Sequence, residues 1–283
     1  MSDRRPPDGV APTPQHIRAG IVAYAAGDAL GVPWEGSTPD EVRWEALEAL
    51  PARGDWPRGA TSDDTAQLLL VAEYLVEANG QVDERAFLGR LAKALPGMRG
   101  AGPTTKAAVR RFLATGELHA TDGSSIGAAM RAPPFGWTTP VAEMAAWAIE
   151  QHPVDAVVAA GLREAEDAAR HYTLDPATLQ PLRRAASGDW PPTTAEPTLD
   201  ALATVASVLY VLREAKDLAT ALKRAVALGG DTDTTAAIVG GILGCQLEDV
   251  ESQIPWISRV GMPDARLIEA AAAGLYELRR SSQ

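Results

Sequence analysis

The sequence predicts an all-α protein, and three observations support this. Hydrophobic residues make up 46% of the 283 residues, which is enough for a sizeable core. Aromatic residues make up only 5% and alanine is abundant, a composition that favours packed helices over sheets. Apolar residues also recur every three to four positions in many segments, whereas alternating strand patterns are scarce.

The first segments indicate a short tail followed by one folded unit. Residues 1–14 are rich in proline and charge, so we expect a disordered tail there. Ile17 and Ile21 begin a helical pattern that Gly31 and the following proline stop. Since no later segment resembles an interdomain linker, residues 15–283 are expected to form a single domain.

The remaining helices follow in chain order from the same periodicity. They are expected at 40–50, 66–72, 83–95, 103–115, 140–150, 153–170, 199–213, 216–228, 233–244 and 264–280. The segment 174–198 is rich in proline and threonine, and we expect a long irregular connection there.

Charge and cysteine content exclude several classes of function. The formal net charge of -11 disfavours bulk nucleic-acid binding, because an acidic surface repels a phosphate backbone. Cys245 is the single cysteine, so no disulfide framework or zinc thiolate cluster is expected, which is typical of a reducing compartment. The first residues lack an apolar signal region and no apolar run reaches about 18 residues. A cytoplasmic protein without a membrane partner is therefore expected.

Two acidic clusters stand directly before apolar helical patterns. One is Gly229-Gly230-Asp231-Thr232-Asp233-Thr234-Thr235, in which two glycines precede two carboxylates and three hydroxyls. The other is Thr61-Ser62-Asp63-Asp64-Thr65. Each cluster therefore combines hydroxyl groups with paired carboxylates at the expected start of a helix.

Each acidic cluster admits two explanations. Aspartate, serine and threonine cap helix N-termini, and for one cluster alone capping is the better explanation. Both clusters, however, hold one carboxylate more than a cap needs, and adjacent carboxylates repel each other unless a cation is present. Carboxylate and hydroxyl oxygens select hard ions such as Mg²⁺, Ca²⁺ or Mn²⁺. We therefore expect the two clusters to meet around a divalent-cation site.

Two further sequence features are, on their own, weak evidence for a binding site. The segment 122–134 offers glycines and serines whose N–H and hydroxyl groups suit a phosphate, although an ordinary turn explains it equally well. It fits neither a Walker loop nor a dinucleotide fingerprint. His152 lies at an expected helix boundary, where a single histidine is usually structural.

Taken together, these motifs resemble the ADP-ribosylglycohydrolase family, which includes the dinitrogenase-reductase-activating glycohydrolases and ADP-ribosylhydrolase-like proteins. The matching segments occur in the family order and extend over most of the chain. They are Gly27-Asp28-Ala29-Leu30-Gly31 with Glu35, Ser62-Asp63-Asp64-Thr65, Gly127-Ala128-Ala129-Met130-Arg131, His152-Pro153 and Gly229-Gly230-Asp231-Thr232-Asp233-Thr234.

The resemblance implies a compact single-domain orthogonal helical bundle with a binuclear Mg²⁺ or Mn²⁺ centre in a cleft. The metal ligands implied are Ser62, Asp63, Asp64, Asp231, Asp233 and Thr234. The catalytic residues implied are Glu35, Asp63, Asp64 and Asp233. The residues implied to bind the substrate are Ser124, Ser125, Ile126, Gly127 and His152.

The implied activity is hydrolysis of the glycosidic bond between ADP-ribose and a protein side chain or small molecule. The expected partner is therefore ADP-ribose or an ADP-ribosylated substrate, and a monomer is expected. The family usually has Gly-Asn-Gly where this chain has Ser125-Ile126-Gly127. This departure leaves open two alternatives, a module that binds ADP-ribose or a nucleotide-sugar without turnover and a hydrolase of another ribosyl substrate.

Overall fold

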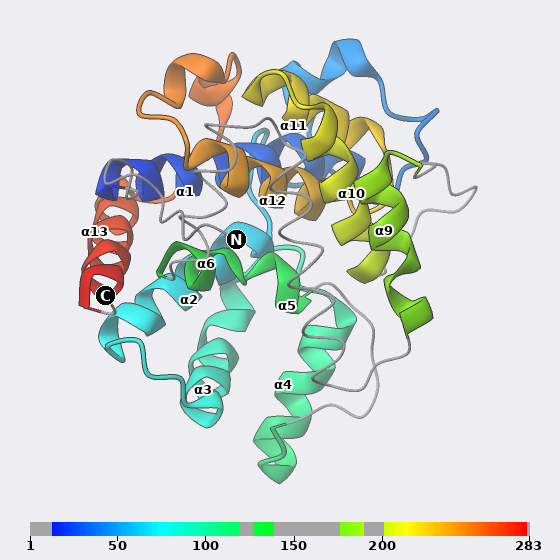
Figure 1. Cartoon of the computed structure of the whole chain (residues 1–283). Helices are drawn as coiled ribbons and strands as arrows, with labels where there is room; N and C mark the ends of the chain where they lie inside the picture. The colour runs from blue at the N-terminus through cyan, green and yellow to red at the C-terminus, as the bar shows by residue number, and fades with distance from the viewer. Residues whose placement is uncertain (1–12, 119–126, 139–175, 190–200, 282–283) are drawn as a thin grey trace, which may run out of the picture.

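The computed structural model describes residues 13–118, 127–138, 176–189 and 201–281 (Figure 1). Every regular element in these ranges is a helix, which confirms the all-α prediction for the described part of the chain. The α-helices are α1 (Pro14–Gly31), α2 (Asp63–Glu77), α3 (Glu84–Ala94), α4 (Pro103–Thr115), α5 (Gly127–Met130), α6 (Pro133–Thr138), α9 (Gln180–Ser187), α10 (Ala201–Glu214), α11 (Leu218–Ala227), α12 (Thr232–Gly244) and α13 (Ala265–Ser281). The 3₁₀ helices are η1 (Val32–Trp34), η2 (Trp44–Ala49), η3 (Leu95–Gly97), η4 (Pro176–Leu179), η5 (Glu251–Gln253) and η6 (Ile257–Arg259).

The expected irregular connection at 174–198 was wrong where the structure describes it. Residues 176–187 form η4 and α9, and Leu182 and Ala185 of α9 are buried against α10. Apolar burial on one face thus outweighs the helix-breaking composition of the surrounding segment. The pattern at 40–50 forms the 3₁₀ helix η2, and the helices expected at 140–150 and 153–170 lie outside the described residues.

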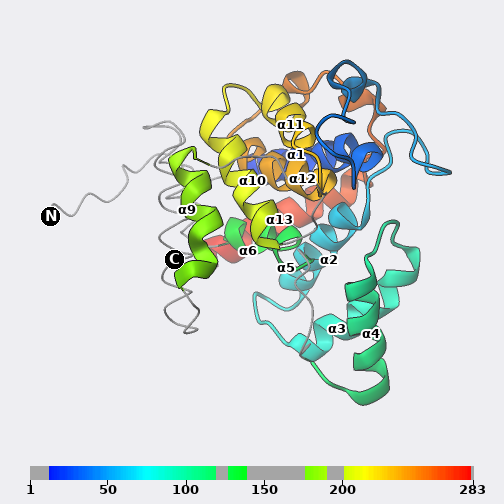
Figure 2. The same cartoon turned by 90° about the vertical axis from the view of Figure 1, so that its right-hand side faces the viewer.

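Helices α1 and α12 form the centre of the molecule and pack along each other (Figures 1 and 2). Glycines at their interface allow the two backbones to touch. A Cβ atom added at Gly27 would lie 2.3 Å from the Ala236 carbonyl oxygen, and one added at Gly31 would lie 2.4 Å from the Asp233 Cα. This close approach brings the C-terminal end of α1 beside the N-terminus of α12.

The other helices surround this central pair. Helices α10, α11 and α13 bury one face each against α1 or α12, and α2 packs on α13. Helices α3 and α4 lie at one end of the molecule in both views, over a smaller cluster that includes Leu70, Leu91 and Val109 (Figure 2). The N-terminus of α2 therefore faces the ends of α1 and α12, where the two acidic clusters can meet.

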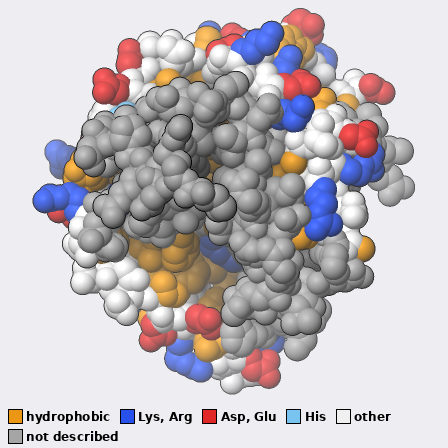
Figure 3. All heavy atoms as spheres, viewed as in Figure 1, with side chains coloured by type: hydrophobic (Ala, Val, Ile, Leu, Met, Phe, Trp, Pro, Cys, Tyr) orange, Lys and Arg blue, Asp and Glu red, His pale blue; other side chains and the backbone are white. Residues whose placement is uncertain are grey.

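The surface mixes charges of both signs. On the face drawn in Figure 3, acidic and basic side chains lie near one another around the rim, and hydrophobic side chains gather in a hollow below the centre. Among the described helices, none is both long enough and apolar enough to cross a membrane.

Candidate metal centre

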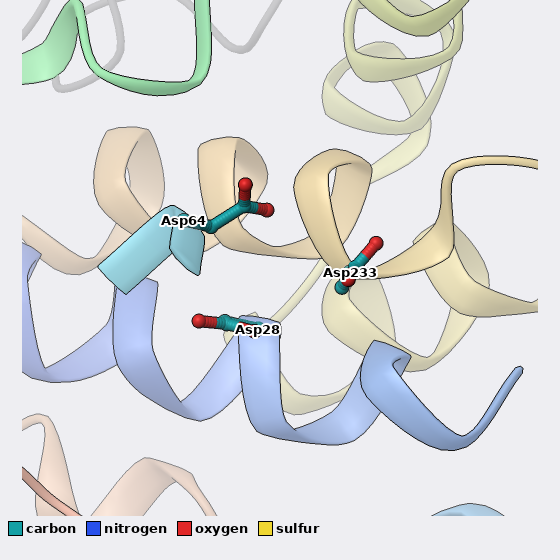
Figure 4. Close-up of side chains that lie close together, drawn as sticks. All are labelled: Asp28, Asp64 and Asp233. Atoms are coloured by element: carbon teal, nitrogen blue, oxygen red, sulfur yellow. The ribbon is translucent and has the colours of Figure 1, made fainter. Parts of the chain in front are cut away.

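Three carboxylates from three helices meet where α1, α2 and α12 converge. Asp28 lies near the end of α1, Asp64 in the first turn of α2 and Asp233 in the first turn of α12 (Figure 4). One carboxylate oxygen of each residue lies within 4.8 Å of the other two. All three residues are buried, with exposed fractions of 0%, 3% and 5%, respectively. The structure therefore joins the two acidic clusters and adds Asp28 to them.

Asp28 holds the first turn of α2 in place. Its carboxylate accepts hydrogen bonds from the backbone N–H of Ser62 (3.0 Å) and of Thr65 (3.1 Å). The Thr65 hydroxyl donates a third hydrogen bond, of 2.5 Å, to Asp28 Oδ2. These contacts anchor the cluster of Ser62, Asp63 and Asp64 to α1. Asp28 therefore helps to hold the expected ligands of α2 in position.

In the acidic cluster of α2, Ser62 caps the helix, whereas the carboxylates of Asp63 and Asp64 are not needed for the cap. Ser62 is the N-cap residue, and its Oγ accepts a 3.0 Å hydrogen bond from the Asp64 N–H. Asp63 Oδ2 accepts a 2.5 Å hydrogen bond from the side-chain amide of Gln67. Asp64 Oδ2 is buried and has no hydrogen-bond partner. Capping therefore accounts for Ser62 but not for Asp64.

The cluster on α12 is not a side-chain cap. Asp231 occupies the N-cap position, yet its side chain makes no capping hydrogen bond and its buried Oδ2 has no hydrogen-bond partner. Asp233 Oδ1 accepts a 3.0 Å hydrogen bond from the Thr234 N–H. Thr232 donates through its hydroxyl to the carbonyl of Gly31 (2.9 Å), which ties the start of α12 to α1. The capping explanation, which the residues alone left open, thus fails for Asp231.

The loop before α12 is paired with the loop that carries Glu35. Gly229 and Gly230 have φ angles of 72° and 73°, in the left-handed region that favours glycine. Gly230 donates to the Ser37 carbonyl (2.9 Å), and Gly36 donates to the Gly230 carbonyl (2.8 Å). These two backbone hydrogen bonds fix the Glu35 loop beside Asp231.

Burial and mutual repulsion make the ionised carboxylates costly. Burial raises the pKa of Asp64 well above its ordinary value, and the charges of Asp28 and Asp231 raise it further. Burial likewise raises the pKa of Asp233 well above its ordinary value, with further increases from Asp64 and Glu35. Burial also raises the pKa of Asp28 and of Asp63 to about 6, against hydrogen bonds that act in the opposite direction. The ionised carboxylates of Asp64 and Asp233 thus repel one another, and a bound cation would relieve that repulsion.

The residues present fit a divalent cation. Buried carboxylate oxygens without partners are rare, because such groups cost roughly 1–3 kcal/mol or more. Here the oxygens come from carboxylates and hydroxyls on three helices, the donor set preferred by Mg²⁺ and Mn²⁺. Helix N-termini at α2 and α12 add a smaller favourable potential of about 0.3–1 kcal/mol each. The cluster can therefore hold one or more hard cations.

Glu35 lies at the edge of this cluster. It directly follows η1 and forms an ion pair with Arg53, and its side chain is 25% exposed. Its charge contributes to the raised pKa of Asp63, Asp231 and Asp233. Glu35 therefore lies near the cluster without belonging to the group of three carboxylates.

Most of the expected substrate-binding residues fall outside the described part of the chain. Ser124, Ser125, Ile126 and His152 are among them. Gly127 is buried at the start of α5, where an added Cβ would lie 3.6 Å from the Thr105 hydroxyl oxygen.

Sequence reasoning assigned no role to three side chains around the cluster. Asp28 and Arg131 belong to the matching segments, yet the resemblance implies no ligand or positioning role for either, and Gln67 lies outside those segments. The available signal was a carboxylate three residues before the glycine that ends the first helix. Such a charge at a buried helix end is unusual without a partner.

Known proteins share the sequence pattern and the fold of this chain. A family model described as ADP-ribosylglycohydrolase matches residues 11–283. An uncharacterized protein from Archaeoglobus fulgidus is 26% identical over 304 aligned residues, which cover 93% of this chain and 97% of that relative. A solved structure of an ADP-ribosylglycohydrolase-related protein complex is 24% identical, with a TM-score of 0.71 over 94% of this chain and 98% of that chain. The solved structure shows a shared fold, and the family model confirms the resemblance inferred from the motifs.

Proposed function

The chain belongs to the ADP-ribosylglycohydrolase family, and we propose that it is a metal-dependent hydrolase that cleaves the bond between ADP-ribose and a modified acceptor. One observation carries the proposal: the buried carboxylates of Asp28, Asp64 and Asp233 converge, and buried oxygens of Asp64 and Asp231 lack a hydrogen-bond partner among the described residues. The family match over residues 11–283 supports assigning the activity to one unit that begins near residue 15.

Two Mg²⁺ or Mn²⁺ ions are the proposed cofactors. Their ligands would come from the two acidic clusters, with Asp28 as the support that fixes the α2 cluster on α1. The proposed ligands are Ser62, Asp63, Asp64, Asp231, Asp233 and Thr234. When bound, such ions supply positive charge that orients ribose hydroxyls and water and lowers the pKa of that water.

The chain's own residues would perform the remaining chemistry. Glycoside hydrolysis passes through a transition state with positive charge on the sugar, which nearby carboxylates stabilise. Asp63, Asp64 and Asp233 supply that negative charge in a buried setting where electrostatic interactions are strong. Glu35, on the loop pinned beside Asp231, is the proposed general base because it is partly exposed. Gly127 begins α5 and directly follows Ser124, Ser125 and Ile126 in sequence, which are proposed with it and His152 to bind the substrate.

The proposal is tested by supplying the purified protein with Mg²⁺ or Mn²⁺ and substrates in which ADP-ribose is linked to arginine, serine, an O-acetyl group or a nucleobase. Release of ADP-ribose from at least one substrate is expected from the wild type and should be lost in Asp64→Asn. Glu251→Gln, which changes a carboxylate far from the cluster, is the matched control and should retain the activity. Tight binding of ADP-ribose to the metal-loaded protein with no release from any substrate would contradict hydrolysis and favour a binding module.

A further inference from the structure

A buried glutamine connects Asp63 to an arginine. Gln67 lies one helical turn after Asp63 on α2 and is fully buried. Its side-chain nitrogen donates a 2.5 Å hydrogen bond to Asp63 Oδ2. Its side-chain oxygen accepts a hydrogen bond from Arg131 Nη1. The three side chains therefore form a continuous chain of hydrogen bonds from Arg131 to Asp63.

The chemistry of the two ends fixes the orientation of the amide between them. A guanidinium group only donates hydrogen bonds and an ionised carboxylate only accepts them. The Gln67 oxygen must therefore face Arg131, which leaves the nitrogen to face Asp63. A flipped amide would place donor against donor and acceptor against acceptor around the fully buried Gln67. Arg131 thus fixes the Gln67 amide with its N–H group toward Asp63 Oδ2.

Arg131 itself is fixed between two parts of the molecule. It directly follows Met130, whose carbonyl accepts a 2.7 Å hydrogen bond from the buried Tyr24 hydroxyl of α1. A Cβ atom added at Gly127 would lie 3.7 Å from Arg131 Nη2, so the guanidinium lies against the start of α5. The same side chain therefore contacts both Gln67 and the segment that begins α5.

We propose that Gln67 and Arg131 are positioning residues that hold the Asp63 carboxylate in the orientation required by the metal centre. This inference rests on the metal centre of the proposed function. Neither residue is assigned as a ligand. Residues that orient metal ligands through hydrogen bonds typically change metal affinity 10- to 100-fold when they are removed.

The test is a calorimetric titration of Mn²⁺ into the metal-free full-length protein. Gln67→Leu and Arg131→Met are each expected to weaken Mn²⁺ binding by about 10- to 100-fold. The double variant should be little weaker than Gln67→Leu alone, because both substitutions break the same chain of hydrogen bonds. Arg131→Lys keeps a donor at this position and should recover part of the affinity, which a purely structural defect would not predict.

Arg279→Met is the matched control. Arg279 is also a buried arginine, with 1% exposure, and it donates a 3.2 Å hydrogen bond to the Trp137 carbonyl rather than reaching Asp63. Its loss should lower the melting temperature but leave Mn²⁺ affinity within about twofold. Circular dichroism of every variant verifies folding, and Arg131→Lys remains informative if the more severe substitutions fail to fold.

Two outcomes would overturn the positioning role while leaving the metal centre in place. One is wild-type Mn²⁺ affinity in folded Gln67→Leu. The other is additive losses in the double variant, which would show that the two residues act independently. If the wild-type protein binds no Mn²⁺, the proposed metal centre itself fails, and the positioning role fails with it.

Discussion

Carboxylate groups lie at both ends of helix α1, and their negative charge is balanced differently at the two ends. Near the N-terminal end, Arg18 donates to Glu251 (2.6 Å) and Glu269 (2.7 Å), whose side chains are 39% and 61% exposed. Near the C-terminal end, Asp28 meets Asp64 and Asp233 in a fully buried cluster. The first site contains its own cation, whereas the second gathers like charges.

The pKa values of the two ends move in opposite directions. The hydrogen bond from Arg18 lowers the pKa of Glu251, while burial raises the pKa of Asp64 and Asp233. An exposed carboxylate with an arginine partner is stable in its ionised form without a bound metal ion. A buried group of carboxylates is stable only if a proton or a metal ion balances its charge. The difference supports the proposal that the buried end binds a cation from solution.

The largest effect should come from removing one carboxylate at the buried end. Asp64→Asn should weaken Mn²⁺ binding by more than about 100-fold, since even the loss of a residue that orients a ligand costs 10- to 100-fold. Titration calorimetry measures this directly. Glu251→Gln at the exposed end should bind Mn²⁺ as the wild type does. An equal loss of Mn²⁺ affinity in both variants would show that the two ends of α1 do not differ in metal binding.

A second substitution disturbs the buried end without touching a carboxylate. Gly31→Ala should destabilise the protein by roughly 3 kcal/mol, because its Cβ would lie 2.4 Å from the Asp233 backbone and overpacking strains a core. Urea denaturation measures the free energy of unfolding. Gly89→Ala in α3, where an added Cβ meets nothing within 4 Å, is the control and should stabilise by about 0.4–1 kcal/mol. A neutral Gly31→Ala would mean that α1 and α12 do not need this close approach.

A third prediction concerns the metal-free protein. Asp64→Asn should raise the free energy of unfolding by roughly 1–3 kcal/mol, because it removes a buried charge whose Oδ2 has no partner. The sign is opposite to that of most substitutions in a core. Thermal denaturation in the presence of a chelator measures it. Destabilisation instead would show that the ionised cluster is already balanced by the chain itself.

The smallest effect is expected at the exposed end. Glu251→Gln should cost about 0.2–1 kcal/mol at neutral pH, the range for exposed ion pairs. Because the pKa of Glu251 is lowered, its contribution is present above the ordinary glutamate value of 4.5 and is lost as the pH falls through the folded value. Urea denaturation at pH 7 and at low pH should therefore show the difference from the wild type shrinking in acid. The exposed Glu248→Gln is the control, and a difference that persists in acid would contradict the pairing with Arg18.

Local sequence signals predicted much of the site and of the fold. Apolar periodicity predicted α1, α2 and α12, and the excess of carboxylates before α2 and α12 predicted that these helix starts form one site. The role of Asp28 and the chain from Arg131 through Gln67 to Asp63 were not predicted. The contact of Asp28 with Ser62 and that of Arg131 with Gln67 join residues 34 and 64 positions apart in sequence, and only the packing of the chain brings them together. Helix α9 was missed because its stability comes from burial against α10 rather than from its own composition.

Thermal denaturation of the metal-free wild-type protein at increasing MnCl₂ or MgCl₂ tests whether the buried end of α1 needs a cation from solution. A ligand that binds only the folded state stabilises it by about 2.7 kcal/mol at 100 times its Kd. The melting temperature of the wild type should therefore rise steadily with divalent-ion concentration, while that of Asp64→Asn should barely change. An unchanged wild-type melting temperature up to millimolar concentrations of both ions would contradict cation binding at the buried end of α1.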